Sequence, residues 1–344
     1  MNKKGFGLDI GATSMKLVWL EGQKNAFYLK STLIAPTPPK GMLSQSPLDE
    51  EEMAQAISKA VSDSQIPIKD VNVALAENQV YTKVLDMPVL TDKELASAIY
   101  WEAEQYIPVP LPNITLVWNV LRKPEHDTQN EKMQVLMVGA PTMLINKYQK
   151  IIQMAGLNLH AMETEILSTV RALIISEDFP TTLVINIGAV NTSFAIVRKG
   201  SMVFTYSMSL GGAAINRAIA TDFGLSSQQA EEYKQAYGVE GKTLGGKIGQ
   251  ATEPILNSIL AEIRKSIVYY TQKYKDEEPV RQILLSGGTA KLPGIEVFFA
   301  NNSGIETAIA NPWKVLAPQQ IPKDVLDNAA DYTISVGLAM KDYL

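Results

Sequence analysis

The sequence predicts an α/β protein made of two lobes with the same topology, and two matching segments are the main evidence. Leu8–Val18 and Ile185–Val197 each contain an apolar run, a polar residue, Ile-Gly-Ala, a short polar turn and a second apolar run. This order is typical of a strand, a tight turn and a returning strand. The central glycines, Gly11 and Gly188, lie 177 positions apart in 344 residues. The spacing favours an internal duplication, and the alternative is a chance match between two unrelated hairpins.

Each turn is also a candidate anion site. Glycine permits backbone conformations that a Cβ would hinder. Successive turn N–H groups that point the same way form a nest that can hold a phosphate. In a duplicated molecule, two such nests would face each other.

The composition describes a globular protein and excludes several kinds of site. A chain of 344 residues suggests two or more domains, and 46% hydrophobic with 19% charged residues argues against disorder. The net charge of −5 argues against a generally basic nucleic-acid surface. The lack of cysteine excludes disulfides and thiolate zinc sites, and His126 and His160 lack the spacing of metal ligands.

No segment predicts a membrane anchor. Asp9 interrupts the first apolar run too early for a secretory signal. No stretch of 18 apolar residues occurs, and the best, Val135–Ile145, is broken by a glycine and a proline. We therefore expect a cytoplasmic protein.

A strand, a helix and another strand are expected after the first hairpin. The strands are residues 27–34 and 71–75, the second because its apolar residues alternate. The helix should open with Ser46 as its N-cap, Pro47 at the first helical position and Asp49 three residues after the cap.

Residues 78–160 have a different pattern of expected strands and helices from the segments around them, and they predict a small inserted α+β subdomain. A capping box of Thr91 with Glu94 starts a helix that Pro108 closes. Lys123–Lys132 reads as a solvated hairpin tip. The other expected elements are strands near 80–86, 114–121 and 134–138 and a helix near 142–155, ended by Gly156.

A further series of helices surrounds the second hairpin. One is expected at residues 163–175. Gly211 and Gly212 follow a strand and open another, whose free N–H groups and dipole favour an anion. Residues 226–238 form the next helix, and its first serine and final glycine mark its two ends.

The last part of the chain contains a segment that resembles part of a P-loop and, after it, a pair of glycines. Residues 241–243, Gly-Lys-Thr, lack the earlier P-loop glycine, since position 236 is Ala236, so we interpret them as a loop. The strand 281–285 runs into Gly287-Gly288, where a flat ring could lie on the backbone, with a flexible turn as the alternative. A helix is expected at 331–343. The long helix between has a stripe of core residues: Ile255, Ile259, Ile263, Ile267, Tyr270 and Tyr274.

Taken together, the segments resemble the actin-like ATPase superfamily in order and spacing. Residues 9–16 and 186–193 are similar to its two phosphate motifs, and residues 285–295 to its adenosine motif. Residues 163–173 and 332–339 resemble its two connecting helices. The resemblance implies two lobes of duplicated ribonuclease-H-like topology. They would comprise 1–77 with 161–180 and 331–344, and 181–330 with a helical subdomain at about 217–275.

Within the superfamily, the inserted block resembles the PilM family of type IV pilus assembly. The resemblance rests on Met87-Pro88, Glu94-Leu95 and Ile99–Pro108. The region of Gly211-Gly212 and 230–234 resembles both the PilM and the FtsA families. FtsA proteins end in an amphipathic membrane helix and GspL proteins continue into a membrane span, neither of which we expect here. An FtsA-like cell-division protein is the alternative.

The resemblance implies ATP with Mg²⁺ between the lobes. Asp9 would hold Mg²⁺ mostly through water, and Lys16 would neutralise phosphate charge. Glu231 and Lys234 would reach the ribose or the adenine. The remaining implied contacts to phosphates and base are Gly11, Ala12, Thr13, Ser14, Gly188, Ala189, Asn191, Thr192, Gly211, Gly212, Gly287 and Gly288.

One departure from the superfamily concerns the chemistry. The second phosphate motif usually has an acid where this chain has Asn186. An asparagine can hydrogen-bond water but cannot accept its proton as a base. We therefore expect nucleotide binding with slow or absent hydrolysis, and we assign no catalytic residue.

The resemblance also implies a function and a partner. The protein would be an ATP-binding scaffold that links the inner-membrane platform of a pilus to its cytoplasmic motor. Residues 78–160 and the adjoining face of the first lobe would bind the N-terminal cytoplasmic tail of PilN, which would hold the protein at the inner membrane. Four apolar residues could line the groove or form the insert's own core: Ile99, Tyr106, Ile107 and Trp118. The other possible functions are a small-molecule kinase of the same fold and a scaffold with an empty cleft.

Overall fold

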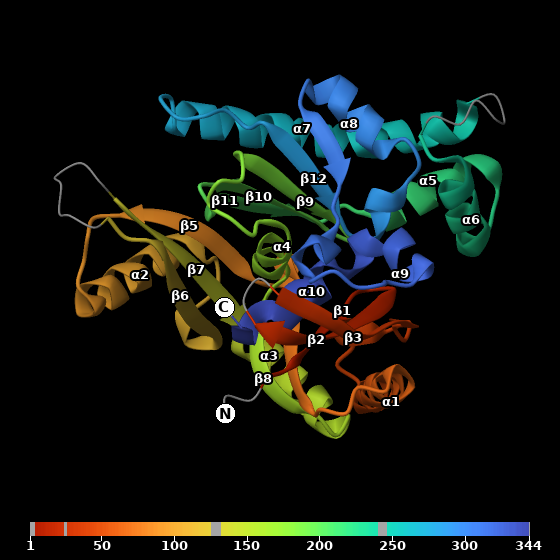
Figure 1. Cartoon of the computed structure of the whole chain (residues 1–344), viewed down its shortest axis with the longest axis horizontal. Coiled ribbons are helices and arrows are strands. Elements are labelled where there is room, and N and C mark those ends of the chain that lie inside the picture. The colour runs from red at the N-terminus through yellow and green to blue at the C-terminus, as the bar shows by residue number, and fades with distance from the viewer. Residues whose placement is uncertain (1–3, 24–25, 125–131, 240–245, 344) are drawn as a thin grey trace.

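The computed structural model describes residues 4–23, 26–124, 132–239 and 246–343, which form three sheets and the helices around them. Figure 1 shows two larger sheets with the helices α4 and α10 between them and the smallest sheet to one side. Most of the expected hairpin tip at 123–132 and the loop at 241–243 lie outside the described residues. In the described part of the chain, no helix combines the length and the apolar character needed to cross a bilayer.

The two larger sheets have the same strand order. They run β3-β2-β1-β4-β8 and β11-β10-β9-β12-β13. In each, the first three strands form an antiparallel meander, and the last two add in parallel. The predicted duplication is therefore confirmed. The strands are β1 (Phe6–Ile10), β2 (Ser14–Gln23), β3 (Ala26–Pro36), β4 (Asp70–Leu75), β8 (Asn158–Thr164), β9 (Thr182–Ile187), β10 (Thr192–Arg198), β11 (Ser201–Met208), β12 (Gln282–Ser286) and β13 (Glu306–Ile309).

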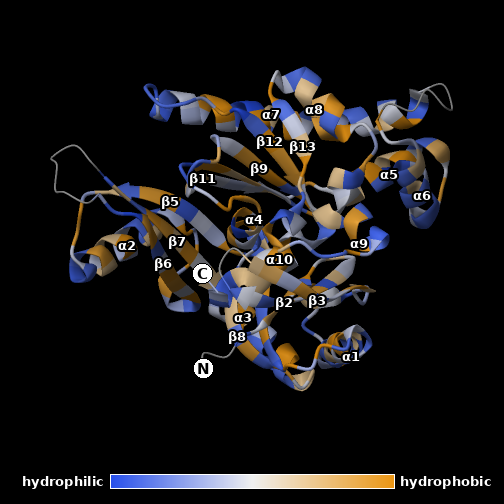
Figure 2. Ribbon diagram, viewed as in Figure 1, coloured by the Kyte–Doolittle hydropathy of each residue, from blue (hydrophilic) through white to orange (hydrophobic). Residues whose placement is uncertain are grey.

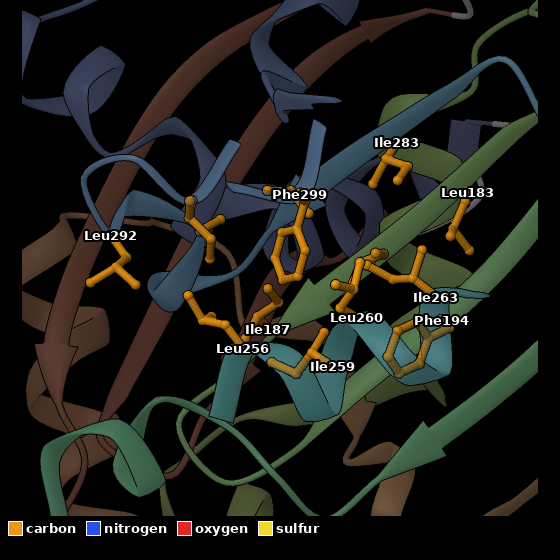
Figure 3. Close-up of a cluster of buried hydrophobic side chains, with 14 of the residues drawn as sticks. Leu183, Ile187, Phe194, Leu256, Ile259, Leu260, Ile263, Ile283, Leu292 and Phe299 are labelled. Atoms are coloured by element: carbon orange, nitrogen blue, oxygen red, sulfur yellow. The ribbon is translucent and has the colours of Figure 1, made fainter. Parts of the chain in front are cut away.

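Each larger sheet has its own apolar core. In the second lobe, Ile187 and Phe194 from the hairpin pack with Ile259 and Phe299 from two helices (Figure 3). Hydropathy follows the same pattern, with apolar residues concentrated on the central strands (Figure 2). The helices of this lobe are α5 (Gly212–Phe223), α6 (Ser227–Tyr237), α7 (Lys247–Lys273) and α8 (Ile295–Ser303). The short α9 (Lys323–Asp327) follows β13, and its Val325 packs with Val18 and Phe27 of the first lobe.

The first lobe's helix α1 (Pro47–Ser64) begins where the sequence predicts, but its cap differs. Ser46 is in the N-cap position, yet its side chain makes no capping hydrogen bond. Instead, Asp49 accepts a hydrogen bond from the hydroxyl of Ser44, just before the helix. Met53 and other apolar residues of the predicted face are buried against the sheet.

Two short helices connect the lobes and cross in close contact. They are α4 (Glu165–Leu173) and α10 (Thr333–Met340). A Cβ at Gly337 would lie only 1.9 Å from the carbonyl oxygen of Ser168, so glycine is required at the crossing. Every residue of α10 is buried. The helix is shorter than the expected 331–343 because tight 3₁₀ turns replace both of its ends.

The insert is a three-stranded sheet covered by one helix. Its elements are β5 (Tyr81–Met87), α2 (Asp92–Tyr106), β6 (Ile114–Arg122) and β7 (Met133–Pro141), in the sheet order β5-β7-β6. The predicted capping box is present, since the N–H of Thr91 donates to Glu94 over 2.9 Å.

The sheet pairing differs from the expected end of the insert at residue 160. Helix α3 (Thr142–Met154) buries Tyr148 and Ile151 in the core of the first lobe. Strand β8 (Asn158–Thr164), which the sequence analysis took in part for a helix start, pairs in parallel with β4. By its sheet, the insert therefore spans residues 81–141, and α3 and β8 return to the first lobe.

Candidate functional site

A cleft of about 930 Å³ opens between the two lobes, and both Ile-Gly-Ala turns line it. The turns are closed by equivalent hydrogen bonds. The N–H of Gly11 donates to the carbonyl of Ser14 over 3.1 Å, and that of Gly188 to the carbonyl of Asn191 over 2.9 Å. Among the described residues, the N–H groups of Ala12 and Thr13 have no hydrogen-bond acceptor, so they are available to an anion in the cleft.

A buried carboxylate and a lysine lie beside the first turn. Asp9 and Lys16 are cross-strand partners in β1 and β2, and Lys16 Nζ is 3.8 Å from Asp9 Oδ2. Burial, together with the charge of Asp331, raises the pKa of Asp9, while Lys16 opposes this shift. A hard cation in the cleft would favour the ionised form of Asp9.

The second turn is held against the start of α5. The carbonyl oxygen of Gly188 accepts hydrogen bonds from the N–H of Gly212 over 2.9 Å and from Thr289 Oγ1 over 3.1 Å. A Cβ at Gly211 would lie 2.5 Å from that same carbonyl oxygen. The glycine pair therefore lets the turn and the helix start approach each other, and of the two only Gly212 lines the cleft.

Thr192 also supports the cleft without lining it. Its side chain is fully buried, and its hydroxyl donates to the carbonyl of Leu210 over 2.6 Å. This bond fixes the loop that leads into α5. The structure thus differs from the expectation that Thr192 faces the phosphates.

At the other end of the cleft, α6 supplies an ion pair. Lys234 Nζ lies 2.7 Å from Glu231 Oε2, which also accepts a hydrogen bond from Asn216. Burial alone would raise the pKa of Glu231, but these hydrogen bonds outweigh it and hold the pKa below its usual value. Both side chains line the cleft, as do Gly287 and Gly288.

Gly287 lies where the chain passes close to the end of β9. Its φ of 85° is in the left-handed region, and a Cβ there would lie 2.6 Å from the carbonyl oxygen of Ile187. Asn186 is 3% exposed, and its Oδ1 accepts a hydrogen bond from Ser286 Oγ over 3.2 Å. The side chain at this point of the cleft lining is therefore an amide that is bonded to the neighbouring strand β12.

Sequence reasoning missed two buried acids that line or border the cleft. Glu165, the first residue of α4, accepts a hydrogen bond from Asn191 Nδ2 over 3.2 Å, and burial and nearby Asp9 raise its pKa to about 8. Glu77 neighbours it, because its N–H donates to Glu165 Oε2, and burial raises the pKa of Glu77 to about 7. In the sequence, an acid at a helix start indicates only a favourable dipole interaction, so no local signal marks Glu165.

A third missed acid is Asp331, which also lines the cleft. It forms an ion pair with Lys291 over 2.5 Å. In the described residues, no group of three or more acidic or histidine side chains could hold a metal. A magnesium ion beside Asp9 would thus need phosphate and water as further ligands, which is how Mg²⁺ is commonly bound.

The four apolar candidates for partner binding divide into two pairs. Ile99 and Ile107 are buried in the core of the insert, where they pack under the sheet. Tyr106 and Trp118 are each 40% exposed, and the Tyr106 hydroxyl donates to the carbonyl of Thr82 over 3.2 Å. Only the second pair is accessible to a partner.

Comparisons with known proteins agree with this architecture. A family model described as type IV pilus assembly protein PilM matches residues 7–343. A chain of a solved PilM-PilN type IV pilus biogenesis complex is 26% identical, with a TM-score of 0.87 over the full length of both chains. The cell division protein FtsA of Streptococcus pneumoniae is 24% identical over an alignment of 356 residues with its gaps, which covers 92% of this chain and 77% of FtsA.

A more distant neighbour shows the fold alone. MreB5 of Spiroplasma citri, solved with AMPPNP, is 13% identical, with a TM-score of 0.53 over 98% of this chain and 95% of that one. The protein therefore has an actin-like ATPase fold. Because the family model spans nearly the whole chain, the protein belongs to the PilM family of type IV pilus assembly proteins.

Proposed function

We propose that this protein is a nucleotide-binding scaffold of type IV pilus assembly that binds ATP with Mg²⁺ in the cleft between its lobes. The observation that carries the proposal is the pair of equivalent turns, one from each lobe, which line one cleft with Asp9 and Lys16 beside them. The AMPPNP bound to the neighbour MreB5 supports the same use of the fold.

Different residues of the cleft suit different parts of the nucleotide. The free N–H groups of the first turn and the Lys16 ammonium suit phosphate oxygens, and Asp9 suits a hydrated Mg²⁺. Lys234 and Glu231 offer a donor and an acceptor to a ribose or a base, and Gly287 and Gly288 line the same cleft, where a flat ring would lie on their backbone. The magnesium ion, when bound, neutralises phosphate charge.

The partner we propose is the N-terminal cytoplasmic tail of a PilN protein. The insert would bind it together with the adjoining face of the first lobe, as an extended peptide at a sheet edge or in pockets for alternate side chains. The PilM-PilN complex of the neighbour at TM-score 0.87 supports this partner. Through it the scaffold would lie at the inner membrane and join the pilus platform to the cytoplasmic motor.

Calorimetry of the intact protein with Mg-ATP tests the nucleotide site. The wild type should bind, and Lys16→Met should weaken binding by about tenfold or more, since it removes a charge-assisted contact of about 1.5–3 kcal/mol. The control is Lys59→Met, an exposed lysine of α1 that pairs with Asp63 on the surface. Absence of binding by a wild-type protein free of co-purified nucleotide would refute the proposal.

A further inference from the structure

The loop between β3 and α1 is bonded to the first turn of the cleft. The N–H of Thr37 donates to the carbonyl of Thr13 over 3.1 Å, and the Thr37 hydroxyl donates to the carbonyl of Gly11 over 2.8 Å. Residues 38–41 then form a tight turn, in which the last N–H donates to the first carbonyl over 2.8 Å. Lys40 occupies the third position of this turn, and its φ of −83° and ψ of −24° suit that position.

The far end of the same loop is bonded to α3. Lys147 of α3 donates to the carbonyl of Met42 over 2.5 Å and also to the carbonyl of Ser44. Between the two bonded ends, consecutive prolines at positions 38 and 39 restrict the backbone further. The part of the loop that carries Lys40 is therefore held in place, and Lys40 itself lines the cleft.

Lys40 differs from the other lysines of the cleft lining in its lack of an acidic partner. Within the described residues, the three other lysines of the lining each form an ion pair, whereas Lys40 is exposed and forms none. The pairs are Lys16 with Asp9, Lys234 with Glu231 and Lys291 with Asp331. The remaining acid of the lining, Glu165, is mostly protonated at neutral pH because burial raises its pKa to about 8. The charge of Lys40 is thus available to an anionic ligand.

We propose that Lys40 binds the terminal phosphate of the nucleotide, so that the cleft distinguishes ATP from ADP. This inference rests on the proposed function, in which the phosphates lie at the free N–H groups of the first turn. The loop of Lys40 is bonded to that turn through Thr37, whereas the side chains that suit a ribose or a base come from α6 of the other lobe. The terminal phosphate lies farthest from the base, and its charged oxygens suit an unpaired ammonium group.

Calorimetry with Mg-ATP and with Mg-ADP tests this contact. Lys40→Met should weaken binding of Mg-ATP by about tenfold, because it removes one charge-assisted hydrogen bond. Binding of Mg-ADP should change much less, since ADP lacks the terminal phosphate. The ratio of the two dissociation constants should therefore fall toward one in Lys40→Met. Lys40→Arg keeps the charge and should retain most of the wild-type ratio.

Lys30→Met is the matched control. Lys30 is on β3, shortly before the loop, and pairs with Glu21 over 3.2 Å outside the lining of the cleft. The variant removes the same charge from the same part of the chain and should bind both nucleotides as the wild type does. If the wild type binds ATP but Lys40→Met leaves the ratio of the dissociation constants unchanged, the inference is refuted while the proposed function stands. A wild type that binds no ATP would refute both.

A second measurement uses the wild-type chain and reads Lys40 directly. The exposed Lys40 amine should react with an acetylating reagent in the free protein, and mass spectrometry of the peptide that contains it measures the extent. Saturating Mg-ATP should protect Lys40 from acetylation, and saturating Mg-ADP should protect it much less. The exposed Lys30 and Lys59 should react equally in all three states. Equal acetylation of Lys40 with ATP and with ADP would overturn the inference.

Discussion

Asn191 Nδ2 donates to Glu165 Oε2 over 3.2 Å, and this bond joins the turn of the second lobe to the connecting helix α4. Glu165 is buried, and burial with the charges of Asp9 and Glu77 raises its pKa to about 8. At neutral pH the carboxyl is therefore mostly protonated in the folded protein. The cleft holds a neutral acid that becomes charged just above physiological pH.

Stability should fall as the pH rises through this range. The pKa of Glu165 is about 8 in the folded state against 4.5 unperturbed, so between these values the folded state binds more protons than the unfolded state. The free energy of unfolding then decreases with rising pH. Glu165→Gln should reduce that decrease by about 1–3 kcal/mol between pH 5 and pH 8, at 1.36 kcal/mol per pKa unit.

Urea unfolding at pH 5, 6.5 and 8 without nucleotide measures this. Glu77, whose pKa is raised to about 7, should leave a residual slope in the variant. The control Glu51→Gln removes an exposed carboxyl of α1 and should follow the wild-type pH dependence. Equal slopes for wild type and Glu165→Gln would contradict the assignment.

The sequence predicted the elements that local signals define. The paired turns, the Thr91 capping box and the glycines after β12 all depend on a few adjacent residues, and the structure has each. It could not predict which sheet a strand joins. Strand β8 follows the insert in the chain but pairs with β4, more than eighty positions earlier, and that choice depends on tertiary contacts.

The residues of the candidate site also divide into those that the sequence predicted and those that it could not. Motif spacing brought Asp9, Lys16 and both turns to one cleft, as the structure has it. Glu165 and Asp331 come from helix ends whose sequence shows ordinary capping or surface acids, and only the fold brings them to the cleft. Thr192 belongs to the motif but turns inward, because its hydroxyl meets the Leu210 carbonyl.

Asn186→Asp should raise hydrolysis if the missing acid limits it. The wild type should turn over ATP below about 1 per second, the lower end of the common enzyme range. The variant supplies a carboxylate that can accept a proton from water. A phosphate-release assay with Mg-ATP measures the change, with the exposed Asn257→Asp as control. Fast wild-type turnover would show that a group other than residue 186 already accepts the proton.

Gly337→Ala should destabilise the fold through the crossing of the connecting helices. Its Cβ would be 1.9 Å from the carbonyl oxygen of Ser168, so the helices must separate, at a cost of about 3 kcal/mol or more. Gly156→Ala is the contrasting change, because its Cβ meets nothing within 4 Å and only its φ of 78° opposes alanine, by about 1–2 kcal/mol. Denaturant unfolding of both variants measures the loss in the free energy of unfolding from a steric clash at Gly337 and from backbone strain at Gly156. Equal losses would refute the close crossing of the two helices.

The peptide site can be tested with two exposed tryptophans of the insert. Trp118 is on the edge strand β6, which a hydrogen bond ties to α3 of the first lobe, whereas Trp101 is 65% exposed on α2. We expect Trp118→Ala to weaken binding of a PilN-tail peptide by about tenfold, the loss of one well-buried anchor at an interface. Trp101→Ala should leave the affinity unchanged.

Fluorescence anisotropy of the labelled peptide measures both, and a third variant separates binding from folding. Ile99→Ala empties a fully buried position under the same sheet and should cost about 2–5 kcal/mol of stability. Below its melting temperature, however, it should still bind, since Ile99 does not reach the surface. If Trp101→Ala weakens binding and Trp118→Ala does not, the peptide binds along α2, away from the first lobe.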